Sequence, residues 1–261
     1  LIFSVLSAFF AGITSILAKV GIKNTNSNVA TAIRTSIVLV FSWVMVIIVG
    51  SLGTITMIDF KTWIFLILSG FATGISWLCY FKALQIGDVN KVVPIDKSSI
   101  ILTILFAFLF LHEKITLGKV IGVVLIAIGT FLMIQKKQYK EIKENKNRVW
   151  IMYAIFSAVF ASLTAIFGKI GIDGVESNLG TAIRTSVVLL MAWILVLLAK
   201  QQHAIKDISK KEFLFIGLSG LATGVSWICY YKALQEGITS IVVSIDKLSL
   251  VTVSYTHLTL P

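Results

Sequence analysis

Charged side chains inside long apolar segments are the residues of this sequence best placed to do chemistry. The pair Asp96-Lys97 follows an apolar stretch, and the same pair recurs as Asp246-Lys247. Ionised groups are costly among apolar residues, so such groups are functional candidates. One hypothesis is that each aspartate takes up and releases a proton, and the other is a structural ion pair with a neighbouring arginine or lysine. Desolvation and a basic neighbour shift a carboxyl pKa in opposite directions, so the sequence leaves both open.

Two arginines occupy equivalent apolar surroundings. Arg34 and Arg184 stand in identical hexapeptides, at 31–36 and 181–186. A planar guanidinium binds a carboxylate or a phosphate through two hydrogen bonds, so these residues predict an anionic or zwitterionic ligand. The alternative is that each arginine pairs with an aspartate of a neighbouring segment, and the two hypotheses are compatible.

A third group combines small, hydroxyl-bearing and aromatic side chains at helical spacing. Gly70 and Gly74, and again Gly220 and Gly224, are spaced to place small residues on one helix face and allow close helix approach. The residues that follow them predict the wall of a cavity for an amphipathic solute, or alternatively packing contacts and an interfacial aromatic belt. They are Thr73, Ser76, Trp77 and Tyr80, and then Thr223, Ser226, Trp227 and Tyr230.

The recurrence of all these residues 150 positions later indicates that the chain is a duplication. Aligned without a gap, roughly 46 of the first 100 positions are identical in the two halves. A period this long indicates duplication of a whole half rather than a short repeat unit. We therefore predict a first repeat over 1–135, a basic linker over 136–148 and a second repeat over 149–251.

Apolar runs of about 20 residues, long enough to cross a bilayer, predict the elements that position these side chains. An odd number of five helices per repeat would place the repeats in opposite orientations, as in many secondary transporters. We predict an all-α membrane protein of two five-helix inverted repeats, with ten helices in the parent and about nine here, the last incomplete. The predicted helices lie at 1–20, 29–50, 62–84, 92–111, 116–135, 150–170, 179–200, 212–234 and from near Val242.

Composition and charge exclude most other classes of protein. The 261 residues are 57% hydrophobic and 13% charged, whereas soluble globular domains carry about 25% charged residues. The net charge of +11 lies in loops and in the linker, not on one compact basic surface, so we expect no nucleic-acid partner. Because positive loops mark the cytoplasmic side, we predict a cytoplasmic linker in a multi-pass protein of the cell membrane, most simply a prokaryotic cytoplasmic membrane. Motifs typical of enzymes, metal sites and cofactor sites are missing, so we expect no enzyme activity, metal or cofactor.

The C-terminal end departs from the repeat pattern. Residues 253–261 have no counterpart in the first half and resemble a translated sequencing-library adapter. We expect native sequence to stop near Val251 and residues 252–261 to be non-native. The alternative is a terminus that has diverged between the repeats.

The repeat plan and two local motifs carry a resemblance to a known family. The two five-helix halves, the Leu111-His112-Glu113-Lys114 turn and the segment from Gly118 to Gly129 resemble the EamA family of the drug/metabolite transporter superfamily. The Pro-Ile-Asp-Lys-Ser-Ser motif at 94–99 resembles a subgroup of small EamA proteins. The resemblance implies ten helices and movement of small metabolites by alternating access. Family members with cytoplasmic termini are familiar, which conflicts with the orientation predicted from charge.

These features together predict a secondary transporter for a small amino-acid-like or other polar or amphipathic solute. Its expected partners are the solute, the lipid bilayer and, as a coupling ion, protons, and the chain could act as a monomer or a homodimer. The alternatives are a non-transporting membrane scaffold or receptor and, among transporters, a multidrug exporter. Against the exporter, the predicted helices 1–20 and 150–170 hold no acidic residue, unlike the first helix of the small multidrug resistance family.

Overall fold

The computed structural model describes residues 1–21, 25–87, 91–92, 95–96, 98–132, 149–247 and 249, and within these ranges the regular elements are helices. The contacts divide the chain into two compact units that each contain parts of both repeats. Unit 1 is Leu1–Phe71 with Phe167–Pro261, and unit 2 is Ala72–Ile166. Lys97, the linker and the predicted non-native tail lie outside the described residues.

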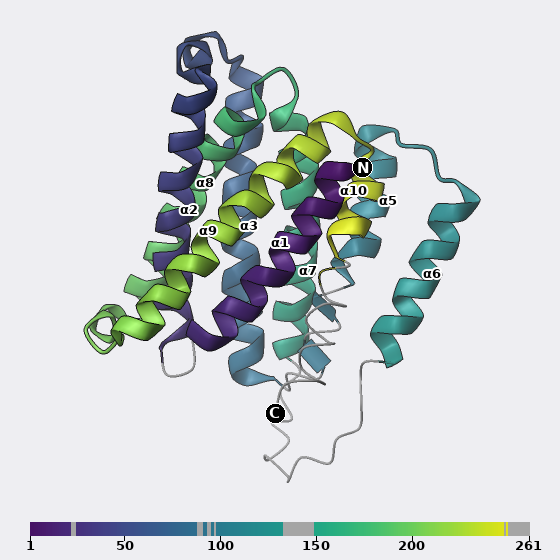
Figure 1. Ribbon diagram of the computed structural model, residues 1–261. Coiled ribbons are helices and arrows are strands. Elements are labelled where there is room, and N and C mark those ends of the chain that lie inside the picture. Colours follow the sequence, from purple (N-terminus) through teal and green to yellow (C-terminus); the bar gives the residue numbers. More distant parts are fainter. Residues whose placement is uncertain are drawn as a thin grey trace. The chain divides into compact units, whose positions relative to one another are not determined.

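Unit 1 is a bundle of long helices in which segments from the two repeats lie side by side. Helix α1 lies along α9, and α2 packs against α8 and α9 (Figure 1). The elements are α1 (Ile2–Gly21), α2 (Ser27–Val49), η1 (Ser51–Met57), the start of α3 (Phe60–Ile86), the end of α7 (Val149–Ile172), α8 (Ser177–Leu198), η2 (Gln202–Ile205), α9 (Lys210–Glu236) and α10 (Thr239–Asp246).

Side-chain caps fix where the long helices of unit 1 begin. The Asn26 side chain accepts backbone N–H bonds at the start of α2, and the Glu176 carboxylate accepts the N–H of Leu179 at the start of α8. At the start of α9, Ser209 and Glu212 form a reciprocal capping box. These caps satisfy N–H groups that a helix leaves without an intrahelical partner.

Glycines allow the helices of unit 1 to approach closely. A Cβ atom built on Gly220 would lie 3.0 Å from the Ile37 Cβ, and one built on Gly224 would lie 2.6 Å from the Phe41 Cδ1. On α3, a Cβ on Gly70 would lie 2.6 Å from the Cβ of Val187 in α8. The close approach predicted for the paired glycines is therefore present at these three positions.

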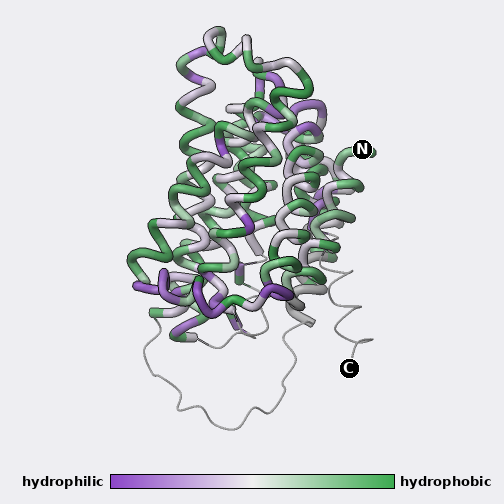
Figure 2. The backbone as a smooth tube through the Cα atoms, turned by 60° about the vertical axis from the view of Figure 1, so that its left-hand side comes forward, coloured by the Kyte–Doolittle hydropathy of each residue, from purple (hydrophilic) through white to green (hydrophobic). Residues whose placement is uncertain are grey.

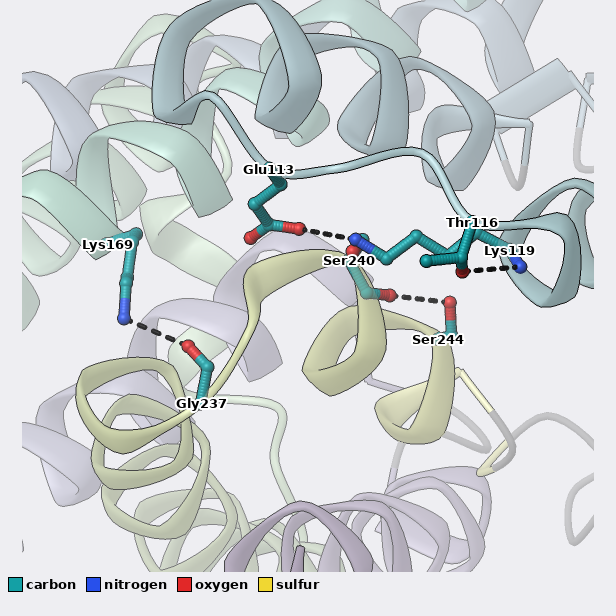
Figure 3. A network of polar contacts seen from close by, with 7 residues as sticks. All are labelled: Glu113, Thr116, Lys119, Lys169, Gly237, Ser240 and Ser244. Atoms are coloured by element: carbon teal, nitrogen blue, oxygen red, sulfur yellow. Dashed lines mark hydrogen bonds and ion pairs between the residues drawn. The ribbon is translucent and has the colours of Figure 1, made fainter.

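Unit 2 contains the rest of α3, helical residues at 91–92 and 95–96, α5 (Ser99–Leu111), α6 (Leu117–Leu132) and the start of α7. Its fully buried core includes Ala83, Val92 and Ala154, with Tyr80 packed against them. Helix α5 ends at His112, which has φ 53°, and the N–H of Glu113 donates to the carbonyl of Ala107 at 3.2 Å. Beyond that turn, the Lys119 ammonium lies 3.1 Å from the Glu113 carboxylate (Figure 3).

Most predicted spans agree with the helices to within three residues, but the predicted helix at 92–111 is wrong. Helix α5 begins only at Ser99 and has 13 residues, about 20 Å of rise, against a hydrocarbon core of about 30 Å. Ser98 forms a turn between the helical residues 95–96 and α5, so the described part of this span is not one helix. In the second repeat, α10 starts at Thr239 rather than near Val242 and ends after 8 residues at Asp246.

The long helices have the dimensions and composition of membrane spans. Helices α2, α3, α7, α8 and α9 are each long and apolar enough to cross a bilayer, and α1 and α5 add shorter apolar segments. Figure 2 shows apolar residues along the helices and hydrophilic residues gathered mainly at helix ends and in loops. The described residues therefore form a multi-pass membrane protein.

Candidate functional site

In unit 1, the Asp246 carboxylate joins three helices. Asp246 is the last residue of α10, and its Oδ1 accepts a 2.6 Å hydrogen bond from the hydroxyl of Ser7 in α1. The Ser226 hydroxyl of α9 donates to the backbone carbonyl of Ser7 at 3.0 Å, and the two hydroxyl oxygens lie 3.4 Å apart. Both serines are buried. We call Ser7, Ser226 and Asp246 the Asp246 site.

The same arrangement occurs in unit 2 around Asp96. The Ser157 hydroxyl of α7 donates to the Asp96 Oδ1 at 2.7 Å. The Ser76 hydroxyl of α3 donates to the carbonyl of Ser157 at 3.0 Å, and the hydroxyl oxygens are again 3.4 Å apart. Ser157, Ser76 and Asp96 form the Asp96 site, which matches the Asp246 site residue for residue at the 150-position offset.

Each site combines residues from both repeats. Ser7 belongs to the first repeat but binds the aspartate of the second, and Ser157 of the second repeat binds the aspartate of the first. Threonines on the same helices make the same exchange between the repeats. The hydroxyl oxygens of Thr223 and Thr14 lie 3.3 Å apart, and those of Thr73 and Thr164 lie 3.2 Å apart. The first helix of each repeat is therefore held by hydroxyl contacts to the third helix of the other.

Arg184 occupies a buried polar setting in unit 1. Its Nε donates to the Ser69 hydroxyl at 2.9 Å, and 3% of the residue is exposed. The guanidinium carbon lies 5.0 Å from the centroid of the Trp227 ring and 4.7 Å from that of Tyr231. Such cation–π contacts stabilise a cation that has lost most of its water. Tyr230, half-buried, contacts the Tyr231 ring edge-on at 5.2 Å between centroids.

Arg34 has a different environment although its local sequence is identical. Arg34 is half-buried on α2, and within the described part of the chain its guanidinium makes no hydrogen bond or ion pair. Position 81, the counterpart of Tyr231, is Phe81. The two arginines therefore have different surroundings in spite of their identical neighbours in the sequence.

The structure brings together most of the predicted site residues, although their roles stay predictions. Ser226 and Asp246 both contact Ser7 in unit 1, and Ser76 and Asp96 both contact Ser157 in unit 2. Trp227 contacts Arg184. Trp77 and Tyr80 are half-buried on α3. Lys247 caps α10 through its backbone N–H, which donates to the Val243 carbonyl at 3.2 Å.

Sequence reasoning missed Ser7, Ser157 and Ser69. Ser7 and Ser157 are identical residues at equivalent positions of the two repeats, each in the middle of an apolar helix. That coincidence was a usable signal, because a polar residue repeated inside an apolar span needs a partner. Among the described residues, no group of three or more His, Cys, Asp or Glu side chains is arranged to hold a metal ion.

Comparison with known proteins gives one family and several relatives. Residues 1–135 and 148–257 match the model of the EamA-like transporter family. A Sinorhizobium protein described as an uncharacterized transporter in the cobO 3' region is 45% identical over 130 residues, which cover 50% of this chain and 92% of that protein. That relative is therefore about one repeat long. An uncharacterized protein of Methanocaldococcus jannaschii is 33% identical over 102 residues, covering 36% of this chain and 74% of the relative.

A solved structure, described only as the crystal structure of a protein, shows the same fold. It has a TM-score of 0.76, and the match covers all of this chain and 88% of the other. At 14% identity, the similarity shows the fold alone. The family match reaches residue 257, inside the predicted non-native tail, so that assignment stays a prediction, as does the subgroup motif at 94–99.

Proposed function

The chain belongs to the EamA-like transporter family, and from this premise we propose that it is a secondary transporter, not an enzyme, that moves a small amino-acid-like or other polar solute by alternating access. The observation that carries the proposal is the pair of matching Asp96 and Asp246 sites. Each is built at a point where a short helix ends or is interrupted, which is where such transporters place their sites.

The way in which the two sites are built supports alternating access. Two inverted repeats with the same contacts can exchange conformations, so that one face opens as the other closes. The first helix of each repeat is fastened to the opposite repeat by Ser7 and Ser157. A change at either aspartate is thereby transmitted to a helix of the other repeat.

Proton coupling has a physical basis in the same hydrogen bonds. An ionised carboxylate accepts the serine hydroxyl proton, whereas a protonated carboxyl group has a proton of its own to donate. Protonating Asp246 or Asp96 therefore makes the carboxyl group a weaker acceptor for the hydroxyl of Ser7 or Ser157 and weakens the contact that holds α1 or α7. This links proton uptake to helix position.

Arg34 supplies the hypothesis for the substrate. A half-buried guanidinium with no hydrogen bond or ion pair among the described residues can bind a carboxylate or phosphate bidentately. We propose that the solute carries an anionic group that meets Arg34. Hydroxyl and aromatic side chains of α3 and α9 would then contact the rest of an amphipathic or zwitterionic solute.

Proteoliposomes carrying the protein test the function directly. Candidate amino acids are screened by counterflow, and uptake driven by an imposed pH gradient is then compared in Asp246→Asn, Asp96→Asn and the control Asp173→Asn, whose side chain is exposed. We expect the first two variants to lose gradient-driven uptake while retaining counterflow, and the control to keep both. Full gradient-driven uptake in both site variants would refute proton coupling, and solute binding without counterflow would indicate a receptor.

Membrane location and orientation complete the proposal. We propose that the protein lies in a prokaryotic cytoplasmic membrane with the basic linker 136–148 in the cytoplasm, because short basic loops stay on that side. Cytoplasmic and exported reporters inserted in the linker distinguish the two orientations. Activity of the exported reporter alone would reverse the assignment.

A further inference from the structure

The turn between α8 and α9 is rich in lysine. Residues 200–211 contain four lysines and one aspartate, and all five of these side chains are exposed. Within the described part of the chain, none of the four lysines forms an ion pair or a side-chain hydrogen bond. We call residues 200–211 the lysine turn, and its lysines are Lys200, Lys206, Lys210 and Lys211.

The equivalent turn of the first repeat, residues 50–61, carries no net charge, because its charged side chains are Asp59 and Lys61. The two turns lie at opposite ends of unit 1, since α2 and α8 pack side by side and run in opposite directions (Figure 1). The Asn28 amide at the start of α2 donates at 2.8 Å to the side chain of Gln201, just after the end of α8. Both helices are long enough to cross a bilayer, so one turn meets each membrane face.

Three of the lysines stand where the local backbone disfavours them. Lys200 follows the end of α8 with φ 54°, in the left-handed region that favours glycine, and its counterpart is Gly50 with φ 74°. Lys210 and Lys211 are the first two residues of α9, where the positive end of the helix dipole repels a cation. These lysines therefore do not stabilise the ends of their own helices. A negatively charged partner outside the protein explains their positions.

Exposed apolar side chains flank the lysine turn. They are Leu197 and Leu198 at the end of α8, Ile205 within the turn, and Phe213 and Leu214 at the start of α9. Cations beside exposed apolar groups are typical of segments at the boundary between the hydrocarbon core and the lipid headgroups. A lysine there can lay its methylene chain along apolar surface while its ammonium group reaches a phosphate.

We propose that the lysine turn binds the phosphate groups of anionic phospholipids in the adjacent leaflet, and that the turn at 50–61 does not. An anionic lipid matches both features of the lysine turn. Its phosphate complements the ammonium groups, and its acyl chains contact apolar side chains such as Leu198 and Leu214. A soluble acidic protein would match the charge alone. Binding of lipid requires only that the protein lies in a membrane, and not the transport function proposed above.

The local lipid composition at each turn tests the proposal. A fluorophore is attached at Gln202→Cys in the lysine turn or at its counterpart Leu52→Cys, both exposed positions, in full-length protein that also carries Cys79→Ala and Cys229→Ala. In bilayers at physiological salt, quenching by spin-labelled phosphatidylglycerol is compared with quenching by equally labelled phosphatidylcholine. We expect about fivefold preference for the anionic lipid at 202, the gain from one lysine close to an anionic surface, and no preference at 52.

Two matched sets of variants connect the preference to the lysines. Replacing Lys206, Lys210 and Lys211 together by glutamine should reduce the preference at 202 to less than about twofold. Thr56→Lys with Phe60→Lys places lysines at the exposed counterparts of positions 206 and 210. This second set should create a preference of about two- to fivefold at 52.

Three results would overturn the proposal. The first is an equal preference at 202 and 52, and the second is a preference at 202 that survives replacement of the three lysines. The third is quenching at 202 by a soluble, spin-labelled polyglutamate peptide without any preference between the two lipids, which would assign the lysine turn to an acidic protein partner. None of these measurements requires a transported solute, so they are independent of the test of transport.

Discussion

The two aspartate sites are nearly the same, whereas the two arginines that accompany them are not. In the Asp246 and Asp96 sites the serine-to-carboxylate distances are 2.6 and 2.7 Å, and both serine carbonyls are bound at 3.0 Å. Arg184, in contrast, is enclosed by Ser69 and two aromatic rings, while Arg34 is half-buried. Identical hexapeptides have therefore produced different environments.

This contrast separates the contacts that are the same in the two repeats from those that differ between them. The serine–aspartate contacts depend on residues that are identical in the two repeats, so symmetry reproduces them. The setting of Arg184 depends on Tyr231 and Gly168, whose counterparts are Phe81 and Ala18. Two substitutions between the repeats thus accompany a fully buried arginine in the second repeat and a half-buried one in the first.

Removing the arginines should give the largest contrast. Arg184→Met leaves Ser69 without its donor and removes both cation–π contacts, so we expect a loss of about 2–4 kcal/mol in the free energy of unfolding. Arg34→Met should change stability by less than about 0.5 kcal/mol but abolish binding of an anionic solute. Unfolding in detergent and solute binding measure the two effects. Equal destabilisation by the two variants would contradict the comparison.

Filling the space beside Tyr231 should give the next largest effect. A Cβ on Gly168 would lie 2.8 Å from the Tyr231 Cε1 and 3.3 Å from the Ser69 hydroxyl oxygen. Gly168→Ala should therefore cost about 1–3 kcal/mol of stability by displacing the ring that faces Arg184. The matched control is Ala18→Gly, which creates no overlap. Because glycine is a poorer helix former than alanine, this variant should lower the free energy of unfolding by about 1 kcal/mol at most. A neutral Gly168→Ala variant would show that this ring can move freely.

The sequence predicted the repeat, most of the span positions and, among the residues of the two sites, the aspartates and the serines of α3 and α9, because duplication marks them twice. It did not predict that Ser7 binds Asp246 and Ser157 binds Asp96, since pairing between helices far apart in the chain leaves no local pattern. The turn at Ser98, just before α5, was also missed. The contrast between Arg184 and Arg34 could not be predicted from their identical neighbours, because it arises from Trp227, Tyr231 and Gly168 on other helices.

The serines offer a test of the symmetric part of the comparison. Ser7→Ala and Ser157→Ala each remove one hydroxyl donor to a carboxylate, so each should lower the free energy of unfolding by about 1–2 kcal/mol. Independent sites should give additive losses in the double variant. Thermal unfolding of the three proteins supplies both values. A loss in only one single variant would show that the two sites are unequal despite their matching geometry.

The smallest expected effect concerns Glu236, whose counterpart in the first repeat is Ile86. Glu236→Ile makes the end of α9 resemble the end of α3, where Lys82 bonds Gln85. Without Glu236, Lys232 should turn to Gln235 and draw it away from the carbonyls of Ile172 and Val175. Lys169 would still donate to the carbonyls of Leu234, Gln235 and Gly237. We therefore expect the free energy of unfolding to fall by only about 0.5–1 kcal/mol. A Glu236→Ile variant as stable as the parent would mean that Gln235 keeps its contacts without help from the Lys232–Glu236 pair, and that the difference between the two glutamines arises from the conformation of the chain rather than from this substitution.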